Sequence, residues 1–239
     1  MKWSQVGKEI ESSIRKALYE FALVEGVAKV GVALSGGKDS LTLLMMLKAI
    51  SGRGFEPFQV VALHAAGEFT CGAGVDGEYL RKVCEELGVE LRVRRSTKTL
   101  EELECYSCSR ERRSLLFEMA REEGAEVVAF GHHRDDSAQT LLMNLFQKGE
   151  FAALLPKVPM HRYGVTIIRP MIYVAEAEVR AFAAAAGFAR VTCQCPVGQR
   201  SRRKSVEEWL KVAEADFPHV RGNLAQAGLL YGSDKALTP

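Results

Sequence analysis

The stretch Ser35-Gly36-Gly37-Lys38-Asp39-Ser40 decides the fold expected for this chain. It follows an apolar, valine-containing run over 27–34 that has the length of a buried strand, and it precedes residues 41–48, which favour a helix. A strand, a glycine turn and a helix start place backbone N–H groups and the positive end of a helix dipole around an open pocket. The paired glycines allow close approach of a ligand, and Lys38 adds a cation. These features predict a phosphate-binding loop, which we call the glycine loop (residues 35–40).

The glycine loop differs from the common nucleotide pattern G-x-x-x-x-G-K-[ST]. The fifth residue before Gly37 is Val32, and Lys38 is followed by Asp39. A carboxylate directly after the lysine suits metal-assisted release of pyrophosphate. The alternative, a glycine turn without a ligand, needs one glycine and leaves the rest of the combination unexplained. The string S-G-G-K-D-S resembles the PP-loop of N-type ATP pyrophosphatases, which split ATP between the α and β phosphates and adenylate a carbonyl oxygen.

Length and composition fit one large α/β domain with a small appendage. The chain has 239 residues, of which 47% are hydrophobic, enough for a core. Its first residues lead into a charged amphipathic stretch rather than the apolar segment of a signal peptide. The longest apolar run, 181–189, is too short to span a bilayer. We therefore expect a cytoplasmic protein with no membrane partner.

Short apolar segments alternate with helical ones along the chain. The predicted strands cover 27–34, 58–64, 90–94, 127–131 and 165–168, and the predicted helices cover 4–25, 41–48, 78–87, 105–123, a segment after 132 and 206–215. This alternation predicts an α/β fold, a Rossmann-like, doubly wound parallel sheet of about five strands with its site at the carboxyl ends of the strands. We expect an N-terminal helix (1–25), a catalytic domain (26–187) and a short helical extension (188–239).

A second polar motif, His132-His133-Arg134-Asp135-Asp136, follows the fourth predicted strand and should lie at the same sheet edge as the glycine loop. Two carboxylates there suit Mg²⁺, which binds through one or two carboxylates plus phosphate oxygens. An aspartate at a helix start also caps helices without any catalytic role. We expect Asp135 to be the more cap-like and Asp136 to be the metal or nucleotide ligand. One of the two histidines is a candidate acid or base.

Six cysteines in a cytosolic chain indicate thiols or metal ligands rather than disulfides. Cys84 lies on an apolar helical stripe and is expected in the core. Four others form two close pairs, Cys105 with Cys108 and Cys193 with Cys195. Structural zinc takes four ligands, so the first pair needs the second to complete a site. Three thiolates on a cubane iron–sulfur cluster would leave one iron open for hydrosulfide. Closed zinc and redox-active or persulfide-carrying cysteines are the alternatives.

Basic residues gather near these motifs, although the formal net charge is only +2. The three clusters are Arg92, Arg94 and Arg95; Arg110, Arg112 and Arg113; and Arg200, Arg202, Arg203 and Lys204. Any single cluster is ordinary solvated surface. Three clusters close to the reactive motifs favour a phosphate backbone as partner.

Taken together, the motifs resemble the tRNA 2-thiocytidine synthetase (TtcA) family. The resemblance rests on the glycine loop, Cys-Tyr-Ser-Cys followed by Ser-Arg-Glu-Arg-Arg, Gly-His-His-Arg-Asp-Asp with Gln139-Thr140, Leu155-Pro156-Lys157 and Ile168-Arg169-Pro170. These motifs occur in order over nearly the whole chain. The resemblance implies ATP-dependent thiolation of a cytidine, at position 32 of the tRNA anticodon loop, by an enzyme that uses ATP, Mg²⁺ and a 4Fe-4S cluster and forms a homodimer.

The resemblance also assigns residues. The expected ATP-binding residues are Ser35, Gly36, Gly37, Lys38, Asp39, Ser40, His64 and Gly131, and the catalytic ones are Lys38, Asp39 and Asp136. Cys105 and Cys108 are the expected cluster ligands. Cys195, which precedes a proline, is favoured over Cys193 as the third ligand. The expected tRNA contacts are Arg112, Arg113, Arg202, Arg203 and Lys204.

The expected mechanism activates a poor leaving group, the C2 oxygen of a pyrimidine. Attack of that oxygen on the α-phosphate of ATP releases pyrophosphate and makes AMP the leaving group. Sulfur, supplied as sulfide or as a cysteine desulfurase persulfide, then replaces it. One rival is another adenylating enzyme with incidental cysteines: an amidotransferase, a 2-thiouridine synthetase or a lysidine-type ligase. The other is a zinc-containing module that binds a nucleotide or tRNA without catalysis.

Overall fold

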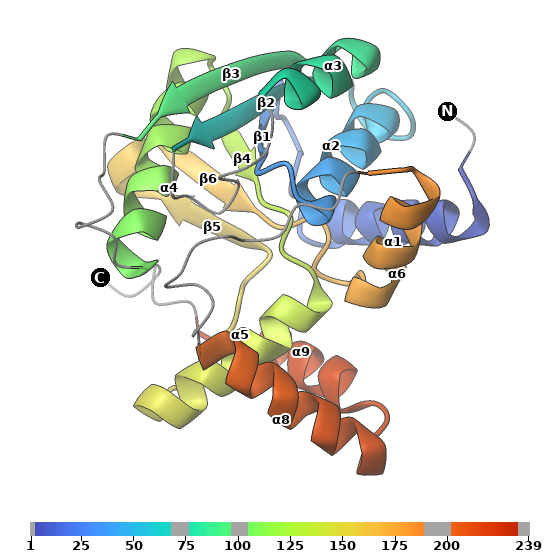
Figure 1. The fold of residues 1–239 in the computed structure, drawn as a ribbon. Coiled ribbons are helices and arrows are strands. Elements are labelled where there is room, and N and C mark those ends of the chain that lie inside the picture. Colours follow the sequence, from blue (N-terminus) through green and yellow to red (C-terminus); the bar gives the residue numbers. More distant parts are fainter. Residues whose placement is uncertain (1–2, 68–76, 97–104, 189–201, 234–239) are drawn as a thin grey trace.

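A computed structural model describes residues 3–67, 77–96, 105–188 and 202–233 (Figure 1). Within these residues six strands form one sheet in the order β3-β2-β1-β4-β6-β5. The strands are β1 (Lys29–Ala33), β2 (Gln59–Ala66), β3 (Glu90–Arg95), β4 (Val127–Ala129), β5 (Lys157–Met160) and β6 (Val165–Ile168). Every neighbouring pair is parallel except β5 with β6. The doubly wound α/β prediction is confirmed, with an antiparallel edge strand in addition.

Helices cover both faces of the sheet (Figure 1). They are α1 (Gln5–Glu20), α2 (Lys38–Ile50), α3 (Gly77–Leu87), α4 (Cys105–Glu122), α5 (Arg134–Lys148), α6 (Glu176–Ala185), α8 (Arg202–Asp216) and α9 (Val220–Tyr231), with a short 3-10 helix η2 (His161–Tyr163). Helix α4 packs on one face, whereas α2, α1, α6 and α3 lie on the other. Helices α5, α8 and α9 pack together beside the sheet. No helix in the described part of the chain is long and apolar enough to cross a bilayer.

The core has one apolar cluster on each side of the sheet. On the α2 side, α1 contributes Ile10, Ile14 and Leu18 from a single face, and these side chains are fully buried. On the α4 side, Phe117 packs against the strands and meets Phe130 and Tyr163, with ring centroids 6.4 and 5.0 Å apart. Apolar burial on both faces is what a parallel sheet requires.

The chain changes direction across the sheet between β1 and β4. From β1 it winds outward to β2 and β3, then returns to place β4 on the other side of β1. Two loops, one after β1 and one after β4, therefore leave the sheet side by side at its carboxyl edge. Such a switch point is where open α/β sheets bind ligands.

The end of helix α1 and the presence of strand β5 differ from the sequence prediction. Helix α1 ends at Glu20 rather than near residue 25, because Ala22 adopts a left-handed φ of 46° and the N–H of Leu23 bonds to the carbonyl O of Leu18. That arrangement is a Schellman end, and its usual glycine signal is missing from the sequence. Strand β5 was not predicted because it contains Pro159, which is tolerated here at a sheet edge.

The C-terminal extension holds a second helix that the prediction took for a tail. Helix α9 contains Gly222 and Gly228, and glycine weakens a helical pattern. Gly228 is required by packing, because a Cβ there would lie 2.7 Å from the Cβ of Ala153. Helix α6, between β6 and the extension, was also not predicted.

The α4-side core makes a first prediction. Phe117→Ala should lower the free energy of unfolding by about 3–5 kcal/mol, because it removes a buried ring and leaves a cavity. Urea denaturation measures the change. The control Tyr19→Ala, at a side chain that is 85% exposed, should stay within about 0.5 kcal/mol of the parent chain. Equal effects of the two changes would contradict the described core.

Candidate functional site

The glycine loop joins β1 to α2 as predicted, and its own side chains brace it. Gly36 has a φ of 80°, a conformation that favours glycine. The hydroxyl of Ser40 accepts the N–H of Ser35 (3.2 Å) and donates to the carbonyl O of Gly37 (3.0 Å). Gly37 is the N-cap of α2 and offers no side-chain cap. The first N–H groups of α2 have no partners within the helix, so they can serve an anionic ligand.

His64 holds the backbone immediately before the glycine loop. Its Nδ1 lies 2.8 Å from the carbonyl O of Leu34, the residue just before the loop. Burial lowers the pKa of His64, so the imidazole is neutral near pH 7 and its Nδ1–H donates to that carbonyl. This contact makes His64 a positioning residue for the loop, whereas β2 contributes Ala65 to the pocket wall.

Lys38 is held by two carboxylates. Its Nζ lies 2.9 Å from Oδ1 of Asp39 and 3.2 Å from Oε1 of Glu176, at the start of α6. Burial would lower the pKa of Lys38, but the carboxylates of Asp39 and Glu176 outweigh burial and raise it. Sequence reasoning missed Glu176 because the helix it opens was not predicted. A Glu178 three residues after Ala175, where the carboxylate accepts the Ala175 N–H, was the available helix-start signal.

The prediction that Asp135 is the more cap-like of the two aspartates at the start of α5 was wrong. The N-cap is His133, so Asp136 occupies the third helical position and its Oδ2 accepts the N–H of His133 (3.1 Å) in a capping box. Asp135 instead accepts the N–H of Glu176 (2.8 Å) and so links α5 to the start of α6. Asp136 is the cap-like residue of this helix, and it also lines a pocket beside the glycine loop.

His133 brings two carboxylates together. Its Nδ1 accepts the N–H of Asp136 (3.4 Å), so the hydrogen of a neutral ring is on Nε2. Nε2 lies 3.8 Å from Oδ1 of Asp39 and 3.5 Å from Oδ2 of Asp136. Among the described residues no group of three or more His, Cys, Asp or Glu side chains forms a metal site. Two hard carboxylates at one pocket nevertheless fit Mg²⁺, which takes its remaining ligands from phosphate and water.

Asp136 also pairs with Arg203, one of the arginines predicted to contact tRNA. The guanidinium of Arg203, in the first turn of α8, lies 2.6 Å from Oδ1 of Asp136. Burial would raise the pKa of Asp136, but the neighbouring side chains of His133, His132 and Arg203 and the hydrogen bond from the His133 N–H outweigh burial and lower it. The carboxylate is therefore ionised at neutral pH and is bound to α8.

Asp39 and Asp136 line a pocket of about 250 Å³ at the switch point, which we call the nucleotide pocket. Its lining residues are Ala33, Leu34, Ser35, Asp39, Ser40, Ala65, Arg112, Leu116, Phe130, Gly131, His132 and Asp136. Gly131, just after β4, allows a close approach of the two segments, because a Cβ there would lie 3.0 Å from the backbone C of Asp39, tighter than an ordinary van der Waals contact. The two predicted motifs are thus brought together by backbone contact.

His132 stacks on Phe130 at the wall of the nucleotide pocket, with ring centroids 5.7 Å apart and an interplanar angle of 10°. Its Nδ1 accepts a hydrogen bond from Nε of Arg169 (3.4 Å). Burial and the charge of Arg169 lower the pKa of His132 to about 3. His132 is therefore neutral at physiological pH, with its hydrogen on Nε2.

The structure places only part of the predicted cysteine site. Cys105 and Cys108 form the first turn of α4, three positions apart, and residues of the following turns line the nucleotide pocket. Cys71, Cys193 and Cys195 lie outside the described residues. Cys84 is buried, as predicted, and burial raises the pKa of its thiol to about 11.

The predicted basic clusters differ in their partners and in their exposure. Arg92 pairs with Glu90 and Glu123, and Arg94 pairs with Glu118 and Glu122, so two of the three arginines of this cluster pair with carboxylates at the surface. Arg112 and Arg113 lie half-buried beside the nucleotide pocket. Arg202 and Lys204 are exposed at the start of α8, on either side of Arg203.

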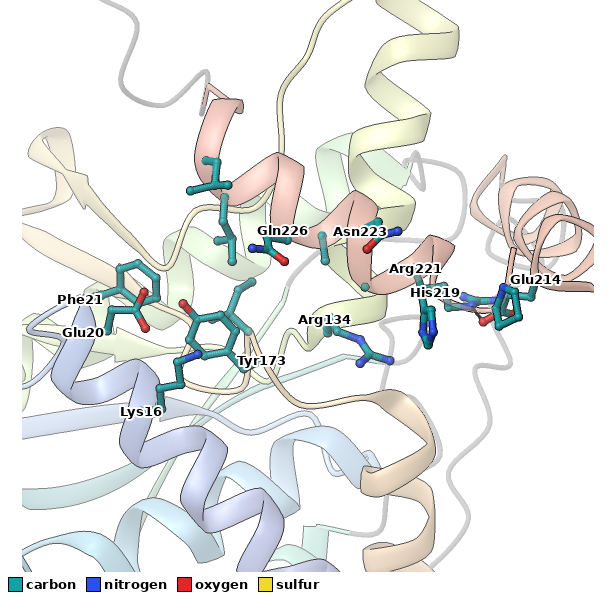
Figure 2. Close-up of a pocket in the computed structure, with 16 residues that line it drawn as sticks. Lys16, Glu20, Phe21, Arg134, Tyr173, Glu214, His219, Arg221, Asn223 and Gln226 are labelled. Carbon is teal, nitrogen blue, oxygen red and sulfur yellow. Dashed lines mark ion pairs between the residues drawn. The ribbon is translucent and has the colours of Figure 1, made fainter. Parts of the chain in front are cut away.

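A roomier pocket of about 570 Å³ lies away from the glycine loop, between α1, the segment at Tyr173 and α9 (Figure 2). Nζ of Lys16 lies 4.5 Å from the centre of the Tyr173 ring on one side, and Asn223 and Gln226 project from α9 on the other. Arg134 is the one member of the predicted motifs among its lining residues. Of the predicted site residues, the smaller pocket is lined by Ser35, Asp39, Ser40, Arg112, Gly131 and Asp136, whereas Gly36, Gly37, Lys38 and His64 are not among its lining residues.

Comparisons with known proteins concern the family and the fold of this chain. A family model described as a PP-loop domain matches residues 7–207. The tRNA-cytidine(32) 2-sulfurtransferase of Syntrophotalea carbinolica is 35% identical over 230 residues, covering 92% of this chain and 88% of the relative, and that of Geobacter metallireducens is 33% identical over 233 residues with the same coverage. The fold is similar to the U34-tRNA thiolase NcsA of Methanococcus maripaludis, solved with its [4Fe-4S] cluster: the TM-score is 0.76 at 24% identity, over 97% of this chain and 82% of that one.

The close approach at Gly131 makes a second prediction. Gly131→Ala should weaken ATP binding at least tenfold, because the added methyl must push the first turn of α2 away from β4. Isothermal titration with a non-hydrolysable ATP analogue measures the affinity. Gly222→Ala, in α9 with open space around the new methyl, is the matched control and should bind like the parent. Unchanged affinity in Gly131→Ala would show that this contact does not set the loop.

The environment of His132 makes a third prediction. The unfolded chain binds a proton at this residue below about pH 6.5, and the folded chain does so only near the lowered pKa of about 3. The free energy of unfolding should therefore fall as the pH decreases between these values. His132→Asn should make that pH dependence shallower, while His219→Asn at an exposed position should not. Identical slopes for His132→Asn and the parent in urea denaturation would contradict the assignment.

Proposed function

The chain belongs to the PP-loop family and is related over 92% of its length to tRNA-cytidine(32) 2-sulfurtransferases, and from this premise we propose that it is an ATP-dependent tRNA sulfurtransferase. The proposed product is 2-thiocytidine at position 32 of the anticodon loop. The observation that carries the proposal is the convergence of the glycine loop, Asp39 and Asp136 on one pocket, beside the helix that opens with Cys105 and Cys108.

The first half-reaction is adenylation of the base. The C2 oxygen of cytidine attacks the α-phosphate of ATP, a P–O bond to the β-phosphate breaks, and pyrophosphate leaves with that electron pair. The N–H groups at the start of α2 and the cation of Lys38 stabilise the charge that develops on the phosphates. Electrostatic stabilisation of this kind is worth several kcal/mol, and each 1.36 kcal/mol changes the rate tenfold.

Asp39 and Asp136 are the proposed ligands of Mg²⁺. Both carboxylates face the nucleotide pocket and both lie within 4 Å of the same nitrogen of His133. The bound ion would offset negative charge on the phosphates. Because Arg203 now pairs with Asp136, and Lys38 with Asp39, both pairs must loosen when ATP and the ion enter.

The second half-reaction replaces the adenylated oxygen by sulfur. Sulfide attacks C2, the C–O bond breaks, and AMP leaves with its electrons, so no external oxidant or reductant is consumed. The proposed cluster ligands are Cys105 and Cys108, with Cys195 favoured over Cys193 as the third. The first two of these cysteines lie in the first turn of α4. When bound, a 4Fe-4S cluster supplies an iron that can deliver sulfide.

The remaining parts of the proposal concern partners. In it, residues 26–187 carry the adenylation site, and 188–239 bring the second cysteine pair and part of the tRNA surface. Arg112, Arg113, Arg202, Arg203 and Lys204 are the proposed tRNA contacts. Sulfur comes from sulfide, or from a cysteine desulfurase persulfide whose outer sulfur is first reduced to the sulfide level by two electrons from a thiol reductant. The enzyme is proposed to act as a cytoplasmic homodimer, to which α5 and α8 can offer the exposed, adjacent rings of Phe146 and Trp209.

Two variants separate the half-reactions. Lys38→Ala should slow tRNA-dependent pyrophosphate release by about 10²–10³-fold while it retains the iron content of the parent. Cys105→Ala should lose iron and thiolation. Lys48→Ala, at the far end of the same helix, is the matched control for Lys38 and should be fully active.

The assay uses anaerobically purified enzyme, unmodified tRNA, ATP and sulfide, with pyrophosphate release and 2-thiocytidine followed in parallel. A colourless parent enzyme with no iron or labile sulfide, or full thiolation by Cys105→Ala, would overturn the cluster assignment. Full pyrophosphate release by Lys38→Ala would overturn the adenylation site.

A further inference from the structure

A second pocket, of about 400 Å³, adjoins the nucleotide pocket. The two share a wall that consists of Ser35, Arg112, Leu116, Phe130 and His132. Beyond this wall the second pocket is lined by Ser109 and Arg113 of α4, Leu154, Ile167 of β6 and Arg169. Its volume lies within the range of about 300–1,000 Å³ that small-molecule sites occupy. We call it the α4–β6 pocket.

The lining of the α4–β6 pocket combines apolar and cationic groups. Leu116, Leu154 and Ile167 with the ring of Phe130 provide an apolar surface. Arg112, Arg113 and Arg169 provide three guanidinium groups. Proteins bind single nucleotides of RNA with this pair of features, apolar or aromatic side chains against the base and arginines at the phosphate.

One arginine in the shared wall has an unsatisfied hydrogen-bond donor. Nε of Arg112 is buried and has no hydrogen-bond partner among the described residues. A buried, unsatisfied N–H is costly, and a bound ligand that supplies an acceptor removes the cost. Because Arg112 lines both pockets, a ligand bound at their junction lies next to this guanidinium group.

His132 adds a donor of fixed direction. Arg169 donates to Nδ1 of His132, and Phe130 stacks on the ring, so the imidazole has one tautomer and one orientation. Its remaining N–H, on Nε2, is available to an acceptor on a ligand. A pyrimidine presents such acceptors at its O2 and N3 atoms.

Position in the chain connects this pocket to both half-reactions. Ser35 belongs to the glycine loop, where the phosphates of ATP are proposed to bind. Ser109 follows Cys108 directly, so the pocket begins where the first cysteine pair ends. A base bound here would adjoin the glycine loop on one side and the part of α4 that follows the first cysteine pair in sequence on the other.

We propose that the α4–β6 pocket binds the target pyrimidine nucleotide of the tRNA, extruded from its loop, with the base against Phe130, Leu154 and Ile167. Arg113 holds its phosphate, Arg169 keeps His132 oriented, and Arg112 bridges the base site and the ATP site. This inference rests on the proposed function and adds the place where the substrate base binds. An unpaired loop nucleotide is the least costly to extrude.

The test measures binding of cytidine 5′-monophosphate to the full chain when the nucleotide pocket is saturated with α,β-methylene-ATP. Ligand-observed NMR detects the weak binding expected of a single nucleotide. Leu154→Trp should fill the pocket and abolish saturable binding, while its affinity for the ATP analogue stays within twofold of the parent. Leu229→Trp, at a half-buried leucine of the pocket between α1 and α9, is the matched control and should bind both ligands normally.

A second variant covers the case in which Leu154→Trp fails to fold. Arg113→Ala should weaken binding of cytidine 5′-monophosphate about tenfold and leave binding of unphosphorylated cytidine unchanged, because it removes a phosphate contact. Both variants should lower kcat/KM for tRNA thiolation about 10-fold or more without changing the KM for ATP.

The outcomes separate this inference from the proposed function. Displacement of cytidine 5′-monophosphate by the ATP analogue would overturn the inference, since the pocket would then belong to ATP. Unchanged mononucleotide binding in the folded variants would overturn it also. A parent chain that binds the mononucleotide in this pocket but never thiolates tRNA would support the pocket and contradict the proposed function.

Discussion

The contact between Gly131 and the first turn of α2 is the constraint on which the site depends. Strands β1 and β4 are parallel neighbours, so the segments that follow them leave the sheet together. Because Gly131 has no side chain, the segment after β4 can lie close to the backbone of Asp39. A Cβ at this position would lie only 3.0 Å from the backbone C of Asp39. Two motifs separated by about a hundred residues of sequence thereby share one pocket.

The charged side chains around this pocket pair with one another. Lys38 is held by Asp39 and Glu176, while Asp136 is held by Arg203 and His133. An entering triphosphate with Mg²⁺ can exchange these partners, since it offers anions to Lys38 and a cation to Asp136. Arg203 lies in the turn of α8 that follows residues 189–201, so ligand binding and the position of α8 are physically linked.

Much of this arrangement could be predicted from the sequence, because the relevant signals are local. Valine-rich runs and the glycine loop predicted the strands and the switch-point site, and the resemblance predicted the family. The features that were not predicted depend on tertiary contacts. The left-handed Ala22, the edge strand with Pro159 and the glycines of α9 break local rules where packing compensates. The cap role of Asp136 depends on which residue starts α5, and the pairing of Glu176 with Lys38 depends on a distant helix.

The central claim is that ATP activates the C2 oxygen of a tRNA pyrimidine at the glycine loop. It can be tested with tRNA that carries ¹⁸O at C2 of the target cytidine, followed by mass spectrometry of the AMP formed in one turnover. Adenylation of that oxygen predicts AMP with one ¹⁸O in its phosphate for each 2-thiocytidine produced. Unlabelled AMP, or formation of ADP and phosphate in its place, would contradict the claim.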